Sequence, residues 1–228
     1  EYHGFVRKAN GLYNFGLYIT TGRIKDIPGY RLKTAIQLVV ARLGISVQVT
    51  PDQDLLFLDM TEKQRNELIH IFKAHGINTS RPNALYRRAL ACVSLPTCAL
   101  ALTESERYFP HVMRDLNRLV EKHNLMDRAP LVRMTGCPNG CARPYSAEIG
   151  IVGQQNGGKY AIFLGGNHAG TRVGEAVLQK VQMNDLPAHL DRAFAFWKAE
   201  SAPTERFGDF VNRVGTERIK AVMAAESA

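Results

Sequence analysis

Two pairs of cysteines are the residues of this 228-residue sequence best suited to chemistry. Cys92 and Cys98 enclose a segment that contains Pro96, and Cys137 and Cys141 enclose Pro-Asn-Gly. Proline lacks a backbone donor and glycine tolerates positive φ, so neither pair fits an unbroken helix. We therefore predict two loops that present four thiols to one centre.

Three interpretations of these thiols compete on spacing alone. Structural zinc usually takes tighter pairs such as C-x2-C, and both spacings here are wider. A [4Fe–4S] cluster is broader than a single ion and takes four thiolates from such loops. Four buried, unliganded core cysteines are the third interpretation. The spacing favours the iron–sulfur cluster.

Composition limits the remaining function classes. With 45% apolar residues the chain can bury a substantial core, and its net charge of +8 suits an anionic ligand or an acidic partner, although a basic surface without a specific role is equally common. No Lys/Arg-rich run with interleaved aromatic residues points to nucleic acid. No apolar run has membrane-spanning length, and the start, EYHGFVRKANG, lacks a signal-peptide core. We predict a cytoplasmic protein with no membrane and no nucleic-acid partner.

The elements of the first third have the order β-α-β-β-α. RLKTAIQLVVARLG has apolar residues at helical spacing and predicts a helix that ends at Gly44. Thr61 is placed to cap a second helix, EKQRNELIHIFKAHG, which ends at Gly76. This order predicts a ferredoxin-like half-domain over residues 1–77, within an α+β fold class. The predicted strands are residues 11–20, 45–50 and 55–59.

A second domain is expected over residues 78–228, after a polar, proline-containing boundary at 77–86. Thr103 and Glu106 form the pattern of a capping box, which predicts a helix from there to about His123. The frame G-x4-G-K at 153–159 lacks the Ser/Thr of a phosphate-binding loop, so we interpret it as a hairpin turn. The other predicted elements are strands at 131–134, 147–153 and 159–166 and helices at 190–200 and 211–226.

Taken together, the cysteine segments resemble a known family. ACVSLPTCALALTESERYFP, VRMTGCPNGCARPYSAEIGIVG, LGGN and RFGDF resemble the sirohaem and [4Fe–4S] half of assimilatory sulfite and nitrite reductases. The similarity extends over nearly the whole chain, and the first 77 residues resemble the small ferredoxin-like half-domain of that family. The resemblance implies an α/β domain for sirohaem and the cluster over residues 78–228.

The resemblance also assigns roles to the thiols. It implies that Cys92, Cys98, Cys137 and Cys141 ligate the [4Fe–4S] cluster and that Cys141 is in addition the axial ligand of the sirohaem iron. One shared sulfur would then couple the two cofactors and remove a gap that electrons would otherwise cross. Cys141 is therefore the expected catalytic residue.

Four further residues are candidates for binding the cofactors. Sirohaem carries eight carboxylates, and Arg133 and Arg143 flank the second cysteine pair closely enough to bind some of them. Thr135 and Asn139 are placed to hydrogen-bond a propionate or a cluster sulfur. Ordinary surface arginines and turn-stabilising side chains are the competing interpretations.

The activity implied by the resemblance is the six-electron reduction of sulfite to sulfide. A sirohaem nitrite reductase half, an iron–sulfur module without sirohaem and a zinc-stabilised scaffold are the alternatives. Enzymes of this family are about twice as long, so the chain resembles their C-terminal half. The expected partners are the N-terminal half, sulfite, and an electron donor that is either ferredoxin or an NADPH flavoprotein. CARPY resembles the ferredoxin-dependent branch.

Overall fold

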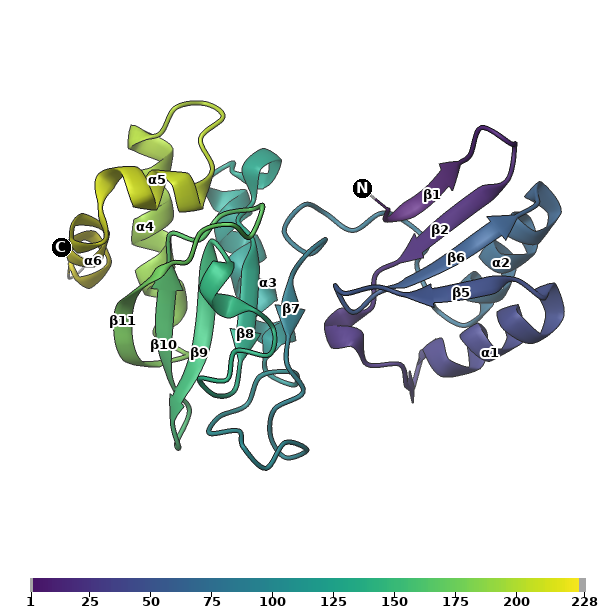
Figure 1. Cartoon of the computed structure of the whole chain (residues 1–228), viewed down its shortest axis with the longest axis horizontal. Helices are drawn as coiled ribbons and strands as arrows, with labels where there is room; N and C mark the ends of the chain where they lie inside the picture. Colours follow the sequence, from purple (N-terminus) through teal and green to yellow (C-terminus); the bar gives the residue numbers. More distant parts are fainter. Residues whose placement is uncertain (1, 226–228) are drawn as a thin grey trace. The chain divides into compact units, whose positions relative to one another are not determined.

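The chain folds into two compact units, of which the first ends at Pro82 and the second begins at Asn83 (Figure 1). The structure, a computed structural model, describes residues 2–225. Each unit combines helices with a sheet, which confirms the predicted α+β fold class. The break between the units falls inside the polar segment 77–86.

The first unit is a four-stranded antiparallel sheet with the order β1-β2-β6-β5 (Figure 1). Phe15 and Phe57 on the sheet and Phe72 on a helix are fully buried and pack against one another, with the Phe57 and Phe72 rings 5.6 Å apart in a T-shaped arrangement. The elements are β1 (Gly4–Arg7), β2 (Tyr13–Leu17), η1 (Thr20–Gly22), β3 (Asp26–Ile27), β4 (Tyr30–Arg31), α1 (Leu32–Leu43), β5 (Ser46–Val49), β6 (Leu55–Met60) and α2 (Glu62–Ala74).

Both helix signals of this unit are confirmed. The helix α1 ends at Gly44, which has a φ of 60° and donates its N–H to Val40 O at 3.1 Å. Thr61 accepts a hydrogen bond from Gln64 N, and the Gln64 side chain accepts one from Thr61 N at 2.9 Å, so the two residues form a capping box.

The edge strand β1 was not predicted from the sequence. It pairs with β2 and forms one edge of the sheet. The strands β2 and β6 lie in the middle, and β5 forms the other edge, which is a ferredoxin-like order. A Cβ on Gly16 of β2 would lie 2.1 Å from Tyr2 O, so this close approach requires glycine.

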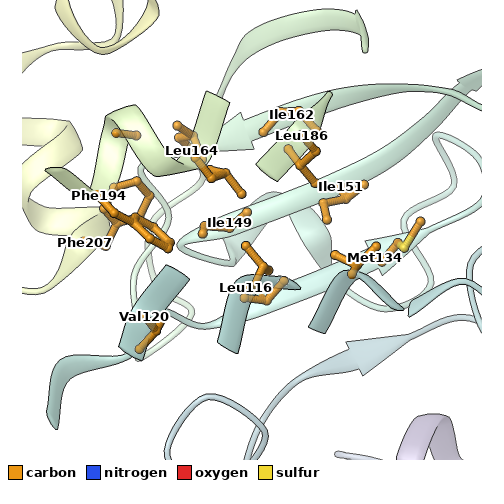
Figure 2. Close-up of a cluster of buried hydrophobic side chains, with 14 of the residues drawn as sticks. Leu116, Val120, Met134, Ile149, Ile151, Ile162, Leu164, Leu186, Phe194 and Phe207 are labelled. Carbon is orange, nitrogen blue, oxygen red and sulfur yellow. The ribbon is translucent and has the colours of Figure 1, made fainter. Parts of the chain in front are cut away.

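The second unit is a five-stranded mixed sheet with the order β11-β10-β9-β8-β7. Its core lies between the sheet and the helices α3 and α4, where Met134, Ile151 and Leu116 are among the residues that Figure 2 shows packed together. The elements are β7 (Leu90–Ala91), α3 (Phe109–Lys122), η2 (Met126–Arg128), β8 (Val132–Thr135), η3 (Pro144–Ser146), β9 (Ile149–Gln155), β10 (Lys159–Leu164), β11 (Glu175–Gln182), α4 (Leu186–Glu200), α5 (Phe207–Val214) and α6 (Thr216–Ala224).

Several predictions for this unit need correction. The helix expected from Thr103 is wrong at its start, because α3 begins at Phe109. The helix expected at 211–226 is broken into α5 and α6 at Gly215, which has a φ of 88°, and its last residue lies outside the described residues. The strands β7 and β11 were missed. The predicted hairpin is confirmed, since β9 and β10 pair antiparallel around residues 156–158.

Within residues 2–225, no helix combines the length and the apolar character that crossing a membrane requires.

Candidate metal centre

The two cysteine loops meet because they follow neighbouring parallel strands. β7 leads into Cys92 and β8 leads into Cys137, and the strands pair in parallel with Ala91 opposite Met134. The carboxyl ends of parallel strands lie at one edge of a sheet, which brings both loops to the same place. The ladder continues into the loops, since Cys92 N donates to Met134 O at 3.1 Å.

Backbone contacts join the first cysteine directly to the second loop. Gly136 N, in the residue before Cys137, donates to Cys92 Sγ at 3.3 Å. A Cβ on Gly136 would lie 1.8 Å from Ser94 Oγ and 2.6 Å from Thr103 O, so only glycine fits between the loops. The sulfur of Cys92 therefore sits in a fixed relation to the second cysteine loop.

Thr103 and Ser105 do not cap a helix but tie the first cysteine loop to the second loop and to β8. Thr103 N and Thr103 Oγ1 donate to Gly136 O at 3.0 and 3.3 Å, and Ser105 Oγ donates to Met134 O at 2.9 Å. The predicted capping box is thus wrong because these hydroxyls have acceptors in the second loop and strand β8. Sequence reasoning missed this function of the two residues.

The second loop is a compact turn. Arg143 N donates to Gly140 O at 2.7 Å, and Tyr145 OH donates to Pro138 O at 2.6 Å. Gly140 has a φ of 68°, and a Cβ there would lie 2.7 Å from the Tyr145 ring. Proline and glycine thus form a turn between Cys137 and Cys141, as the sequence predicts.

The four thiols differ in their accessibility. Cys137 is buried, with 8% of its surface exposed, Cys92 and Cys98 are half-buried, and Cys141 is exposed. All four are free thiols. Burial raises the pKa of the Cys92 thiol, the Gly136 N–H opposes this effect, and the nearby Cys141 adds to it. Among residues 2–225, no three His, Cys, Asp or Glu side chains are grouped to hold a single metal ion.

The other candidate residues lie on β8 and in the second loop. Arg133 and Thr135 on β8 are buried, at 3% and 1% exposed, whereas Asn139 and Arg143 are exposed on the turn. The Thr135 hydroxyl is buried and has no hydrogen-bond partner within the described part of the chain. An orphaned buried hydroxyl costs about 1–3 kcal/mol, so it fits a site that a ligand completes.

These residues fit the groups that the resemblance implies. Four free thiols from two adjoining loops are the donor set of a thiolate-bound iron–sulfur cluster. A backbone N–H donated to one sulfur and an orphaned hydroxyl at the end of β8 belong to the same arrangement.

Known proteins resemble the chain over both units. The curated relatives include the sulfite reductase [NADPH] hemoprotein beta-components of Shewanella woodyi, 37% identical over 93% of this chain, and of Shewanella loihica, 36% identical over 98%. The chain spans 37 and 39% of the lengths of these two relatives.

Solved structures show the same relationship. The Mycobacterium tuberculosis NirA protein matches 95% of this chain with a TM-score of 0.77 and 28% identity, and the match covers 41% of that protein. Dissimilatory sulfite reductase I matches 95% of this chain and 70% of its own with a TM-score of 0.68, and at 11% identity this likeness concerns the fold alone. The family model described as "Nitrite and sulphite reductase 4Fe-4S domain" matches residues 84–228. Because the matched segment is more than half of the chain and contains all four cysteines, the chain belongs to the nitrite and sulphite reductase 4Fe-4S domain family.

Proposed function

We propose that this chain holds the [4Fe–4S] cluster and the sirohaem of a sulfite reductase hemoprotein and serves the six-electron reduction of sulfite to sulfide. The convergence of two cysteine loops at the ends of β7 and β8 carries the proposal. The names of the curated relatives favour sulfite over nitrite, and NADPH over ferredoxin as the source of electrons. Because the chain spans 37 to 39% of these relatives, the proposed role is that of the matching part of the enzyme.

The thiols have distinct proposed roles. Cys92, Cys98, Cys137 and Cys141 are the cluster ligands, and Cys141 is the shared ligand because its exposed side chain is accessible from outside the loops. Gly136 N donates to Cys92 Sγ, and such a bond stabilises negative charge on the sulfur and so raises the reduction potential. The cofactors supply the electron-transfer chemistry when bound, and the chain orients them and tunes their potentials.

The remaining candidates are proposed to bind sirohaem. Arg133 and Arg143 provide cations for its carboxylates from β8 and from the turn. The orphaned Thr135 hydroxyl and the exposed Asn139 amide are available for hydrogen bonds to a propionate or a cluster sulfur. Residues 1–77 are the proposed ferredoxin-like half-domain, and residues 78–228 the cofactor domain.

The test is the cofactor content of the anaerobically purified and reconstituted chain. We expect about four iron and four acid-labile sulfide atoms per chain, and a haem-type absorption band after sirohaem is added. Cys92→Ser should lose most of the iron and sulfide, and Cys141→Ser should in addition abolish the sirohaem band. Thr97→Ser, at an exposed position of the same loop, is the matched control and should retain both.

Other outcomes identify the competing functions. Iron and sulfide without sirohaem uptake would indicate an electron-transfer module, and about one zinc per chain would indicate a scaffold. A chain that takes up neither iron nor sirohaem would refute the proposal. With both cofactors bound and a chemical reductant supplied, faster consumption of nitrite than of sulfite would reassign the substrate.

A further inference from the structure

Ser105 is a fully buried residue that the backbone holds in a fixed position beside the first cysteine loop. Its carbonyl oxygen accepts hydrogen bonds from Phe109 N at 2.8 Å and from Tyr108 N at 3.1 Å, which anchors it to the start of α3. The N–H of the next residue, Glu106, donates to Cys92 O at 3.1 Å. The helix and the cysteine loop therefore fix the Ser105 backbone from both sides.

The Ser105 hydroxyl shares its acceptor with the backbone of Cys92. Ser105 Oγ donates to Met134 O at 2.9 Å, and Cys92 N donates to the same oxygen at 3.1 Å. A serine hydroxyl has one proton, which rotates to the best available acceptor. If this proton turns away from Met134 O, that oxygen keeps its bond from Cys92 N, so the rotation leaves no buried acceptor without a partner.

The sulfur of Cys92 is the other acceptor within reach of this hydroxyl. Burial raises the pKa of the Cys92 thiol, and hydrogen bonds from the Gly136 N–H and the Ser105 side chain oppose this effect. A thiolate that ligates a metal retains negative charge, and hydrogen bonds to charged acceptors are stronger than those to neutral carbonyls. A ligating Cys92 sulfur thus competes with Met134 O for the Ser105 proton.

We infer that Ser105 is a positioning residue that donates a hydrogen bond to the ligating Cys92 sulfur and thereby raises the reduction potential of the [4Fe–4S] cluster. This inference rests on the proposed function and deepens it, since Ser105 ligates no iron itself. The reduced cluster carries one electron more than the oxidised cluster, so its sulfurs are more negative and accept the hydrogen bond more strongly. The proton stays on Ser105 Oγ in both states, so the couple transfers an electron alone.

An anaerobic redox titration of the reconstituted chain without sirohaem tests the inference, with dithionite as the reductant and the EPR signal of the reduced cluster as the readout. At a fixed potential, Ser105→Ala should lower the ratio of reduced to oxidised cluster by up to about tenfold, which is a shift of about 59 mV to more negative potential for one electron. Ser105→Thr keeps a hydroxyl and should restore the potential of the unmodified chain.

Ser201→Ala is the matched control. The Ser201 hydroxyl accepts a hydrogen bond from Arg128 Nη1 at 2.9 Å, in a part of the second unit that precedes β8. This variant therefore loses a side-chain hydrogen bond of the same unit without touching a cysteine loop. It should leave the potential unchanged.

Resonance Raman spectra separate a bond to the sulfur from a merely structural bond to Met134 O. When the chain is reconstituted in D2O, hydrogen bonds to cysteine sulfurs shift the Fe–S stretching bands. The unmodified chain should show the combined effect of Gly136 N–H and Ser105 O–H, and Ser105→Ala a smaller shift. A hydroxyl that stays on Met134 O would give equal shifts in both chains.

The outcomes distinguish this inference from the proposed function. If the unmodified chain and Ser105→Ala assemble the cluster with the same potential and the same deuterium shift, the inference is refuted and the proposed function stands. Loss of the cluster from Ser105→Ala alone would also refute it, because Ser105 would then be needed for assembly. If the unmodified chain assembles no cluster, both are refuted.

Discussion

The replacement Glu148→Gln should destabilise the second unit although it preserves the shape of the side chain. Glu148 is fully buried, and its two oxygens together accept three hydrogen bonds, from Leu131 N, Gly208 N and Arg206. Glutamine has one oxygen and one NH2 group. Whichever way the amide lies, its NH2 faces at least one buried donor.

The size of the effect follows from these contacts. If the glutamine oxygen replaces Oε2, the NH2 group faces Gly208 N, and an unsatisfied buried donor costs about 1–3 kcal/mol. The charge-assisted bond to Arg206 also weakens, but the Arg206 side chain is 28% exposed and water compensates in part. We expect a loss of about 3 kcal/mol in the free energy of unfolding, which corresponds to a drop of roughly 10 °C in Tm.

Trp197 allows the unfolding of this unit to be followed by itself. It is the single tryptophan of the chain, is fully buried, and donates its ring N–H to Glu205 O at 3.1 Å. Urea titrations monitored by tryptophan fluorescence should show the loss in Glu148→Gln. Glu200→Gln removes an exposed ion pair with Arg218 and should change the stability by less than about 0.5 kcal/mol. A loss below about 1 kcal/mol in Glu148→Gln would refute the reasoning.

Three further predictions concern the loops and helices. Gly136→Ala should push the cysteine loops apart and so reduce the iron and sulfide that the reconstituted chain holds. Gly157→Ala is the control, because at a φ of 87° with open space around it the new side chain should lower the stability without lowering the iron and sulfide content. Equal iron contents in the two variants would contradict this reasoning. The hydrogen bond from Arg213 lowers the pKa of Glu205, so the ionised Glu205 stabilises the fold fully above its ordinary pKa of about 4.3, and this stabilisation is lost as the pH falls through the lowered pKa. The difference in Tm between the unmodified chain and Glu205→Gln should therefore disappear on acidification. A difference that stays constant with pH would contradict this assignment. Thr61→Ala should cost about 1 kcal/mol and speed hydrogen exchange in α2 about fivefold, with α3 as the internal control; unchanged exchange in α2 would show that the cap is dispensable.

Local signals in the sequence were sufficient for most of the first unit. Gly44 ends α1 and Thr61 begins α2 because their capping interactions lie within a few residues of each helix. The strand β1 has no comparable signal, since it is four residues long and is defined by its pairing with β2. Such non-local pairing is not encoded in the pattern of one short segment.

The segment from Thr103 to Glu106 shows how tertiary contacts override a local pattern. Its side chains fit a capping box, yet Thr103 bonds Gly136 O and Ser105 bonds Met134 O, more than 25 residues away along the chain. A hydroxyl takes the acceptor that the folded chain places nearest, and here that acceptor belongs to the second cysteine loop and its strand. The feature that misled the helix prediction is therefore part of the candidate metal centre.

The cysteines and the other candidate residues differ in how well the sequence alone reveals them. Thiol ligands are recognisable in sequence because cysteine is rare, with four in this chain, and because each pair lies within a single loop. Arg133 and Thr135 are common residue types on β8, and only the pairing of β7 with β8 places their strand beside the first cysteine loop. The surroundings of such residues therefore depend on tertiary structure, whereas the spacing of the cysteines can be read directly from the chain.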